Sequence, residues 1–239
     1  MKPILLVALI WPALALTACS DSTMEVYNAA VELQEQGQLY EAIAEYDKVL
    51  KMDPQFAEAY RQRGLANASL RRNELAIQDY DNALQIDPES HETYFNRGKL
   101  YELGFNPKSA IEDYSQAIRL MPESSGYFHR RANVYARHGQ VDLALADYAE
   151  AIRLNEVSAI YLDRGRFHGN LSKKQKALDD FTEAIRLDAS NEEAYAMRAT
   201  WNAIIGNDTA AQRDLEKAVN LGYDRPLIES AIEQVKSLR

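Results

Sequence analysis

Alanine residues recur through this chain at an almost constant interval, and this interval constrains the fold more than any other feature. Each alanine opens a motif such as AIQDYDNAL or AIEDYSQAI, and successive alanines lie thirty-four positions apart, or thirty-three in one case. Self-similarity at such a period is the signature of repeat architectures, so we expect six copies of one structural unit. The six alanines are Ala42, Ala76, Ala110, Ala144, Ala177 and Ala211.

Each motif combines large and small side chains at helical spacing. An aromatic residue follows the alanine by four positions in the first five copies, and Leu215 takes its place in the sixth. A small aliphatic residue comes three positions later, and spacings of four and three put these side chains on one face of a helix. The aromatic residues are Tyr46, Tyr80, Tyr114, Tyr148 and Phe181. The small residues are Val49, Ala83, Ala117, Ala151, Ala184 and Ala218.

A second helix is predicted before each of these motifs. In five of the six copies it contains an aromatic residue, with valine in the first, and the residue four positions later is always glycine or alanine. A small residue at that place lets two helices approach closely. Proline follows the second helix at positions 54, 88 and 122, and it disfavours helix in the preceding residue. The two rows are Val26, Tyr60, Tyr94, Phe128, Tyr161 and Tyr195, and Ala30, Gly64, Gly98, Ala132, Gly165 and Ala199.

This pattern is similar to that of the tetratricopeptide repeat (TPR), in which aromatic residues, Leu-Gly, Ala and Pro recur over about 34 residues. The resemblance implies an all-α fold, a right-handed superhelical solenoid of six helix-turn-helix repeats. A coiled coil would instead require a seven-residue period. Residues 226–239 have apolar side chains on one helical face and predict a helix that caps the last repeat. The predicted repeats are residues 23–56, 57–90, 91–124, 125–157, 158–191 and 192–225. The missing residue of the fourth repeat falls in the turn near residues 155–158.

The protein departs from the TPR pattern at one position of the first helix, where arginine replaces leucine in five repeats. An aspartate follows each arginine at a fixed offset of sixteen positions, and the first repeat has Ala29 and Glu45 at these places. Since the antiparallel helices of a hairpin can bring such residues together, we expect structural ion pairs. The alternative is a row of arginines that binds a polyanion. The expected pairs are Arg63–Asp79, Arg97–Asp113, Arg131–Asp147, Arg164–Asp180 and Arg198–Asp214.

Residues 1–18 are typical of a secretory signal peptide. Lys2 precedes an apolar run from Ile4 to Leu16, which is shorter than the ~20 residues that span a bilayer. The stretch Leu16-Thr17-Ala18-Cys19 resembles the lipobox of bacterial lipoproteins. An ordinary secretory signal with a chance cysteine is the competing interpretation.

The lipobox resemblance implies that Cys19, the only cysteine, is acylated and becomes the first residue of the mature protein. More than one acyl chain, palmitate among them, would anchor the protein stably. By resemblance to the sorting rule of enterobacterial lipoproteins, Ser20 after the cysteine favours the outer membrane, whereas an aspartate there would favour the inner membrane. We therefore expect an outer-membrane lipoprotein on the periplasmic side, with residues 19–22 as a short tether.

The composition is that of a globular protein, with 46% hydrophobic and 26% charged residues. The net charge of −9 argues against nucleic acid as a partner, because its phosphates would repel an acidic protein. With a single cysteine, the fold has no disulfide of its own.

No pattern typical of an active site, a metal site or a cofactor site occurs in the sequence. It contains no glycine-rich phosphate loop and no Gly-x-Ser-x-Gly motif. The histidines, His91, His129, His138 and His168, lack metal-ligand spacing, and we interpret His168 as a residue of the core or its edge. We expect no catalytic residues, no metal, no cofactor and no small-molecule substrate.

In the TPR family the first helices line a concave groove that holds an extended peptide or a partner helix. The resemblance places polar, basic and aromatic residues of this protein in that groove, next to Val31, Leu65, Leu162 and Ala196. Basic residues there, in an acidic protein, favour an acidic segment or the carboxyl terminus of a polypeptide as the ligand. The competing interpretation is solvated helix residues without a ligand. The candidates are Tyr27, Arg61, Phe95, Lys99, His129, Asn133, Arg137, Arg166 and Asn170.

The resulting hypothesis is a lipid-anchored scaffold that binds a partner protein or peptide at the membrane. Its size, its six repeats and its anchor are similar to those of pilotin lipoproteins, which assemble type IV pilus secretins. They are equally similar to those of adaptors that recruit peptidoglycan enzymes. The alternatives are a chaperone-like holder of transiting outer-membrane or secreted proteins and, more remotely, an unrecognised enzyme.

Overall fold

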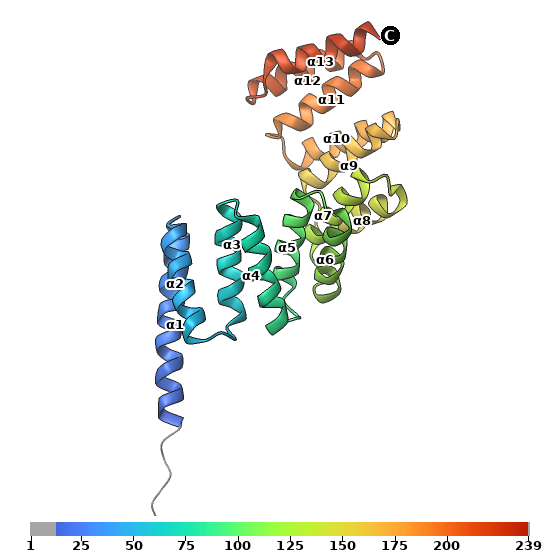
Figure 1. Cartoon of the computed structure of the whole chain (residues 1–239). Coiled ribbons are helices and arrows are strands. Elements are labelled where there is room, and N and C mark those ends of the chain that lie inside the picture. The colour runs from blue at the N-terminus through green and yellow to red at the C-terminus, as the bar shows by residue number, and fades with distance from the viewer. Residues whose placement is uncertain (1–12, 239) are drawn as a thin grey trace, which may run out of the picture. The chain divides into compact units, whose positions relative to one another are not determined.

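The structure is a computed structural model, which describes the backbone of residues 13–238 and the side chains of residues 22–238 (Figure 1). The predicted signal peptide and the side chain of Cys19 fall outside the described side chains, so acylation, the signal and the tether stay predictions. Among the described residues, no helix has both the length and the apolar character that crossing a membrane requires.

The described part of the protein folds into 13 α-helices, twelve of which form six helix-turn-helix hairpins (Figure 1). The first helices are α1 (Ala13–Glu35), α3 (Ala57–Ser69), α5 (His91–Leu103), α7 (Ser125–Arg137), α9 (Ser158–Asn170) and α11 (Glu192–Ile204). The second helices are α2 (Leu39–Met52), α4 (Asn73–Ile86), α6 (Pro107–Leu120), α8 (Val141–Leu154), α10 (Lys174–Leu187) and α12 (Asp208–Asn220). The last helix is α13 (Arg225–Ser237).

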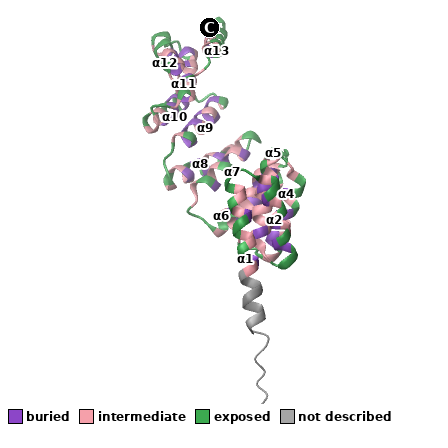
Figure 2. Cartoon of the chain, turned by 90° about the vertical axis from the view of Figure 1, so that its left-hand side faces the viewer, coloured by how far each residue is buried: buried purple, intermediate pink, exposed green. Residues whose placement is uncertain are grey.

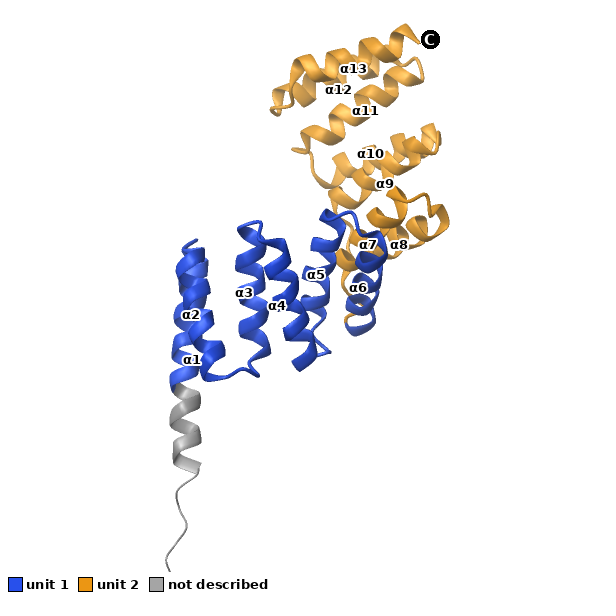
Figure 3. Cartoon of the chain, viewed as in Figure 1, with its two compact units in different colours: residues 1–120 blue, residues 121–239 orange. Residues whose placement is uncertain are grey.

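The protein divides into two compact units, residues 1–120 and residues 121–239 (Figure 3). Unit 1 contains α1 to α6, and unit 2 contains α7 to α13. Within each unit the two helices of a hairpin pack together, and the second helix packs against the first helix of the next hairpin. This is the arrangement that the sequence predicts for the repeats.

In the first five hairpins the core combines a buried ring with a small residue of the first helix, and Leu215 takes the place of the ring in the sixth. A Cβ atom added to Gly64 would lie 2.7 Å from Cε1 of Tyr80, and one on Gly165 would lie 2.7 Å from Cε1 of Phe181. The rings therefore occupy the space that a side chain would need, and both are almost completely buried. Figure 2 shows the buried residues on the sides of the helices that face one another. The predicted pairing of aromatic and small residues is confirmed.

The turn between α8 and α9 contains the deletion that the sequence predicts for the fourth repeat. Residues 155–157 connect these helices, whereas four residues, 53–56, connect α2 and α3. A shorter turn leaves the helix-to-helix contacts of the repeat in phase, because the deleted residue lies outside both helices.

Helix α13 packs against α11 and α12 at the end of unit 2. Ile228 and Ile232 are buried there with Leu215 and Ala218 of α12. These contacts cover apolar side chains of the last hairpin, which is the position expected for a capping helix.

Candidate functional site

In unit 1 the first helix of each hairpin contacts the first helix of the next, α1 with α3 and α3 with α5. We call the surface that they form the first-helix face of this unit. Tyr27 of α1 lies on it, with its ring centroid 5.0 Å from that of Phe56 and 6.0 Å from that of Tyr46. Its hydroxyl donates to Oε1 of Glu58 at 3.3 Å. Burial and the charge of Glu58 raise the pKa of Tyr27 to about 12, so the phenol stays protonated.

Arg61 of α3 is already paired on this face. Its Nε lies 2.8 Å from Oε2 of Glu58 and its Nη2 lies 2.5 Å from Oε1, while Gln62 also donates to Oε1 at 2.9 Å. Burial acts to raise the pKa of Glu58, but the hydrogen bonds from Arg61 and Gln62 outweigh it and lower that pKa. Our expectation that Arg61 makes this face basic is therefore wrong. The signal that we missed is the Glu58–Arg61 spacing of three residues on one helix.

Phe95 and Lys99 of α5 form an aromatic and cationic pair. The Phe95 ring lies 5.7 Å from the Tyr114 ring, and Nζ of Lys99 lies 5.6 Å from the Phe95 ring centroid. No ion pair with a carboxylate is found for Lys99 among the described residues. Its charge is therefore available to a ligand, unlike that of Arg61.

A pocket of about 260 Å³ opens beside this face, between α3, α4 and α5. Glu58 and Arg61 line it together with Phe56, Ser90 and Thr93. It offers an apolar wall, an ion pair and hydroxyl groups, which suits hydrogen bonding to a peptide rather than proton-transfer chemistry.

In unit 2, a polar network lies on the equivalent face. Nε2 of His129 lies 2.8 Å from Oδ2 of Asp163, and Nδ2 of Asn133 donates to the same oxygen at 3.0 Å. The Tyr148 hydroxyl donates to Oδ1 of Asn133 at 2.5 Å. Burial acts to raise the pKa of Asp163, but the hydrogen bonds from His129 and Asn133 outweigh it and lower that pKa. The structure thus brings His129 and Asn133 together around a half-buried carboxylate.

Arg166 of α9 is also paired with carboxylates, so its charge adds little to the basic character that we predict for this face. Its Nη1 lies 3.1 Å from Oδ1 of Asp163, and it forms a second ion pair with Glu193 of α11. Arg137 donates through Nε to the Asn133 carbonyl at 3.3 Å, and Asn170 is exposed at the end of α9.

The aliphatic candidates differ in exposure. Leu162 and Ala196 are buried, with 6% and 1% of their surface exposed, because they pack between neighbouring hairpins. They do not belong to a ligand-binding surface. Val31 and Leu65 are half-buried in unit 1.

All five predicted arginine–aspartate pairs are present, and each joins the two helices of one hairpin. The closest contacts are 2.6 Å for Arg63–Asp79, 2.7 Å for Arg97–Asp113, 2.7 Å for Arg131–Asp147, 2.6 Å for Arg164–Asp180 and 2.8 Å for Arg198–Asp214. In every pair both Nε and Nη2 of the arginine contact the carboxylate. The bidentate geometry and the burial of the aspartates favour a structural role.

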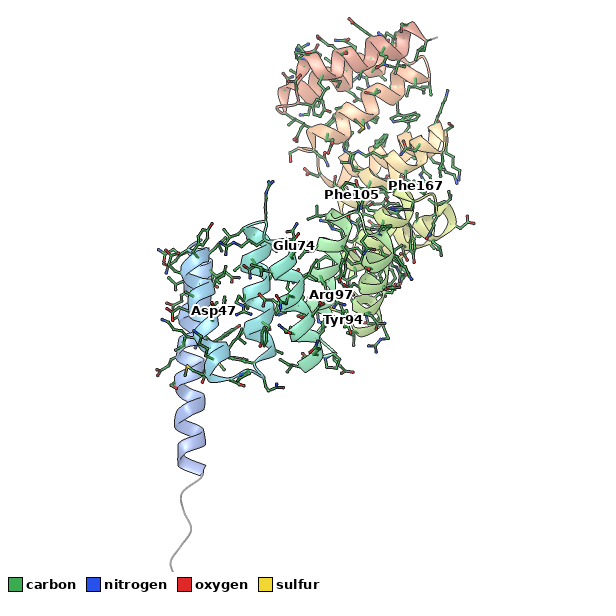
Figure 4. All side chains as sticks on the ribbon, in the orientation of Figure 1. Asp47, Glu74, Tyr94, Arg97, Phe105 and Phe167 are labelled. Atoms are coloured by element: carbon green, nitrogen blue, oxygen red, sulfur yellow. The ribbon has the colours of Figure 1, made fainter. Side chains whose placement is uncertain are left out.

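Two of these arginines also form an ion pair with a carboxylate of the preceding hairpin, which our sequence analysis missed. Nη1 of Arg63 lies 2.5 Å from Oδ1 of Asp47, and Nη1 of Arg97 lies 2.6 Å from Oδ1 of Asp81. Figure 4 labels Asp47 and Arg97 in unit 1. Tyr94 lies beside Arg97, with its ring centroid 5.7 Å from the guanidinium carbon. The missed signal is an aspartate 16 residues before the arginine, in addition to the one that follows it at the same separation.

His168 has a structural partner rather than a free ring. Its Nδ1 lies 2.9 Å from Oδ2 of Asp180, and the residue is 7% exposed. Asn67 and Asn202 occupy the same place in other hairpins and donate to Asp79 and Asp214. Burial lowers the pKa of His168 although Asp180 acts to raise it. The interpretation of His168 as a packed residue agrees with this position.

Within the described residues, no group of three or more His, Cys, Asp or Glu side chains is placed to hold a metal ion. The polar groups of the first-helix faces are instead paired within or between adjacent helices. Such faces can offer hydrogen bonds, rings and the charge of Lys99 to a peptide.

Sequence profiles of one repeat family match this protein. A profile described as TPR repeat matches residues 31–70 and 68–104, and two described as tetratricopeptide repeat match residues 91–124 and 129–194. No curated protein matches the sequence.

Solved structures with a similar fold include PilF, PilW and YrrB. PilF of Pseudomonas aeruginosa is 15% identical, with a TM-score of 0.75 over 93% of this chain and 100% of that one. PilW, described as a widely conserved type IV pilus biogenesis factor, is 19% identical, with a TM-score of 0.75 over 90% of this chain and 98% of that one. YrrB, described as a TPR protein with an unusual peptide-binding site, is 24% identical, with a TM-score of 0.63 over 79% and 97%. At these identities the likeness establishes the fold.

Proposed function

This chain belongs to the tetratricopeptide repeat family, and from that premise we propose that it is a lipid-anchored scaffold of the bacterial envelope. It binds a partner protein or peptide on its first-helix faces. Repeat proteins of this kind use the extended surface of stacked hairpins for binding, because each hairpin contacts only its neighbours and leaves one face open.

The observation that carries this proposal is the chemistry of the first-helix faces. Phe95 and Lys99 combine a half-buried ring with an amine that has no carboxylate partner among the described residues. In unit 2, His129, Asn133 and Asp163 form a network that fixes donors and acceptors at the surface. Fixed polar groups beside aromatic rings suit an extended peptide, whose main chain supplies donors and acceptors of its own.

The charge of the first-helix faces limits which kind of partner segment can bind there. Because Glu58 neutralises Arg61, and Asp163 and Glu193 neutralise Arg166, a strongly acidic segment gains little from these arginines. The partner that we propose therefore has mixed polar and apolar character, and a single carboxylate of it would pair with Lys99.

The proposed lipid anchor and the proposed role in assembly are supported by different observations. The stretch Leu16-Thr17-Ala18-Cys19 supports acylation at Cys19 and an outer-membrane location facing the periplasm. The similarity in fold to PilF and PilW supports a role in assembling a secretion or pilus machine. Recruitment of cell-wall enzymes by the same anchored scaffold is the second version of this proposal.

Site-specific photo-crosslinking in cells tests the binding face. A photoreactive amino acid replaces Phe95 in unit 1 or His129 in unit 2. The controls are Gln116 of α6 and Ala149 of α8, which are exposed on second helices of the same units. One discrete adduct from the first-helix positions alone, identified by mass spectrometry, would support a dedicated partner.

Other crosslinking outcomes would change the proposal. A broad distribution of adducts from Phe95 and His129 would favour the chaperone-like holder. Equal labelling from the control positions would show that the first-helix faces are not the binding surface. Labelling with an alkyne analogue of palmitate tests the anchor separately, and Cys19→Ser should abolish both the label and membrane fractionation.

A further inference from the structure

The turn between the two helices of each hairpin has the same backbone form in all six repeats. Its middle residue has a positive φ, and the next residue donates its N–H to the carbonyl five positions earlier, as Asn106 does to Tyr101 at 2.8 Å. Glycine, which adopts this conformation without steric cost, is the middle residue in three repeats. The middle residues are Gly37, Arg71, Phe105, Gly139, Ser172 and Gly206.

Phe105 is the aromatic residue among these six middle residues. Its φ is 55°, and 93% of its surface is exposed. A left-handed conformation costs a residue with a side chain about 1–2 kcal/mol, and the exposed ring gains no packing that would offset this cost. Leu103, two residues earlier, is 67% exposed. A strained residue without a local structural benefit is evidence for a functional constraint.

The turn holds the backbone of Phe105 in a defined conformation. Oδ1 of Asn106 accepts a hydrogen bond from the Ser109 N–H at 3.3 Å, and Pro107 begins α6. Together with the backbone hydrogen bonds of the turn, these features fix the backbone from which the Phe105 side chain projects. The ring protrudes at the end of α5 (Figure 4).

Within unit 1, the turns at this end of the hairpins are basic. Residues 36–38, 70–72 and 104–106 contain Arg71 and Arg72 and no carboxylate, and Lys108 follows in α6. Four carboxylates, of Glu35, Glu41, Glu74 and Glu102, lie in the adjoining turns of the helices, so the basic character is confined to the turns themselves. Tyr40, 62% exposed, extends the apolar surface under the Arg72 guanidinium, whose carbon lies 4.9 Å from its ring centroid.

The turns at the opposite end of unit 1 have the opposite charge. Residues 53–56 and 87–90 contain Asp53, Asp87 and Glu89 and no lysine or arginine. An acidic protein thus places exposed apolar side chains and cations together at one end of this unit. This combination is complementary to an apolar pocket with carboxylates at its edge.

We propose that Phe105 and Leu103 form a docking knob for such a pocket on a folded partner protein, in addition to the ligand of the first-helix faces. Exposed aromatic anchors that enter a partner's pocket dominate the energy of protein interfaces. Arg71, Arg72 and Lys108 pair with the carboxylates around the pocket.

The direction of α1 indicates that the docking knob contacts a protein and not a membrane. This inference rests on the proposed lipid anchor. The first residues of α1 lie at the end of unit 1 opposite the turns (Figure 1). At a rise of 1.5 Å per residue, Cys19 is roughly 24 Å along the helix from Glu35. An acylated Cys19 would therefore hold the knob away from the bilayer surface.

Phe105→Gly is the central variant of the test, because glycine suits the backbone of this turn. Its unfolding temperature should equal or exceed that of the wild type, so a loss of binding cannot come from misfolding. A photoreactive phenylalanine analogue at position 105 captures the partner in cells, and mass spectrometry maps the labelled peptide. Binding of the purified, identified partner is then measured for wild type, Phe105→Gly, Arg71→Glu and the control Leu227→Ser, an exposed leucine of unit 2.

We expect one adduct on an apolar, carboxylate-edged site of one protein. Phe105→Gly should weaken the purified complex at least tenfold, Arg71→Glu should weaken it and reduce its salt dependence, and Leu227→Ser should not change it. Adducts from Phe95 and His129 should persist in the Phe105→Gly background, which separates this proposal from the proposed function.

Several results would overturn the docking knob. These are a lower unfolding temperature for Phe105→Gly, no adduct from position 105, and an adduct within this protein or with a second copy. Binding of the purified protein to phosphatidylethanolamine–phosphatidylglycerol vesicles that Phe105→Gly abolishes would identify a membrane contact instead. Unchanged partner affinity in Phe105→Gly would also refute it.

Discussion

Arg97 of α5 contacts Asp81, a residue of the preceding hairpin, with 2.6 Å between Nη1 and Oδ1. Nη2 of the same guanidinium lies 2.7 Å from Oδ1 of Asp113 in its own hairpin. One side chain therefore links three helices of unit 1. The two carboxylates differ in burial, since the side chain of Asp113 is 6% exposed and that of Asp81 is 45% exposed.

This difference in burial predicts different costs for removing each carboxylate. Asp113→Asn should lower the free energy of unfolding by about 3–5 kcal/mol, because it leaves Arg97 without its buried partner. Asp81→Asn should cost at most about 1 kcal/mol, because water screens an exposed pair. Urea unfolding of the two variants measures both values, and equal losses would show that the contact between hairpins contributes as much as the pair within the hairpin.

Two helical glycines should respond to alanine in opposite directions. A Cβ atom on Gly169 would overlap the ring of Trp201, so Gly169→Ala should destabilise the protein by about 1–3 kcal/mol. Gly126 of α7 has no atom within 4 Å of that position, so Gly126→Ala should stabilise it by up to about 1 kcal/mol. Thermal unfolding of both variants checks the prediction, and a destabilised Gly126→Ala would contradict it.

The pKa of His168 predicts a loss of stability on acidification. Burial lowers this pKa in the folded state below its usual value of 6.5, against the pull of Asp180 and with Arg164 and Lys176 acting in the same direction as burial. The unfolded state therefore binds a proton first as the pH falls. The contribution is fully present above pH 6.5 and decreases below it.

His168→Asn should remove this dependence while keeping a donor to Asp180, because asparagine already has this role at positions 67 and 202. Urea unfolding at pH 7.5 and pH 5.5 should show a smaller difference for His168→Asn than for the wild type. If the wild type instead became more stable than His168→Asn as the pH falls from 7.5 to 5.5, the pKa of His168 would be raised in the folded state, and our prediction would be wrong.

Asn133 and Tyr148 should be energetically coupled. The Tyr148 hydroxyl donates to Oδ1 of Asn133, whose Nδ2 donates to Asp163. Asn133→Ala leaves both neighbours with one partner fewer and should cost about 1–3 kcal/mol. A double-mutant cycle with Tyr148→Phe should give a coupling of about 0.5 kcal/mol or more, and strictly additive effects would show that this hydrogen bond contributes nothing.

The repeat pattern predicted most of the local structure. Residues within one hairpin keep a constant separation along the sequence, so the offset of 16 residues between Arg63 and Asp79 corresponds to one distance in space. The same holds for Gly64 and Tyr80. Helical periodicity and a short turn suffice to place such residues, and these contacts are present in the structure.

Contacts between hairpins depended on how the repeats pack. Asp163 and His129 are 34 residues apart and on different first helices, and only the spacing of α7 and α9 brings their side chains to 2.8 Å. The periodicity of the amino acids identified the first helices and the residues that they expose. Packing then determined that Asp81 reaches Arg97 and that Glu193 reaches Arg166, because side-chain pairing across hairpins depends on distances that no interval along the sequence specifies.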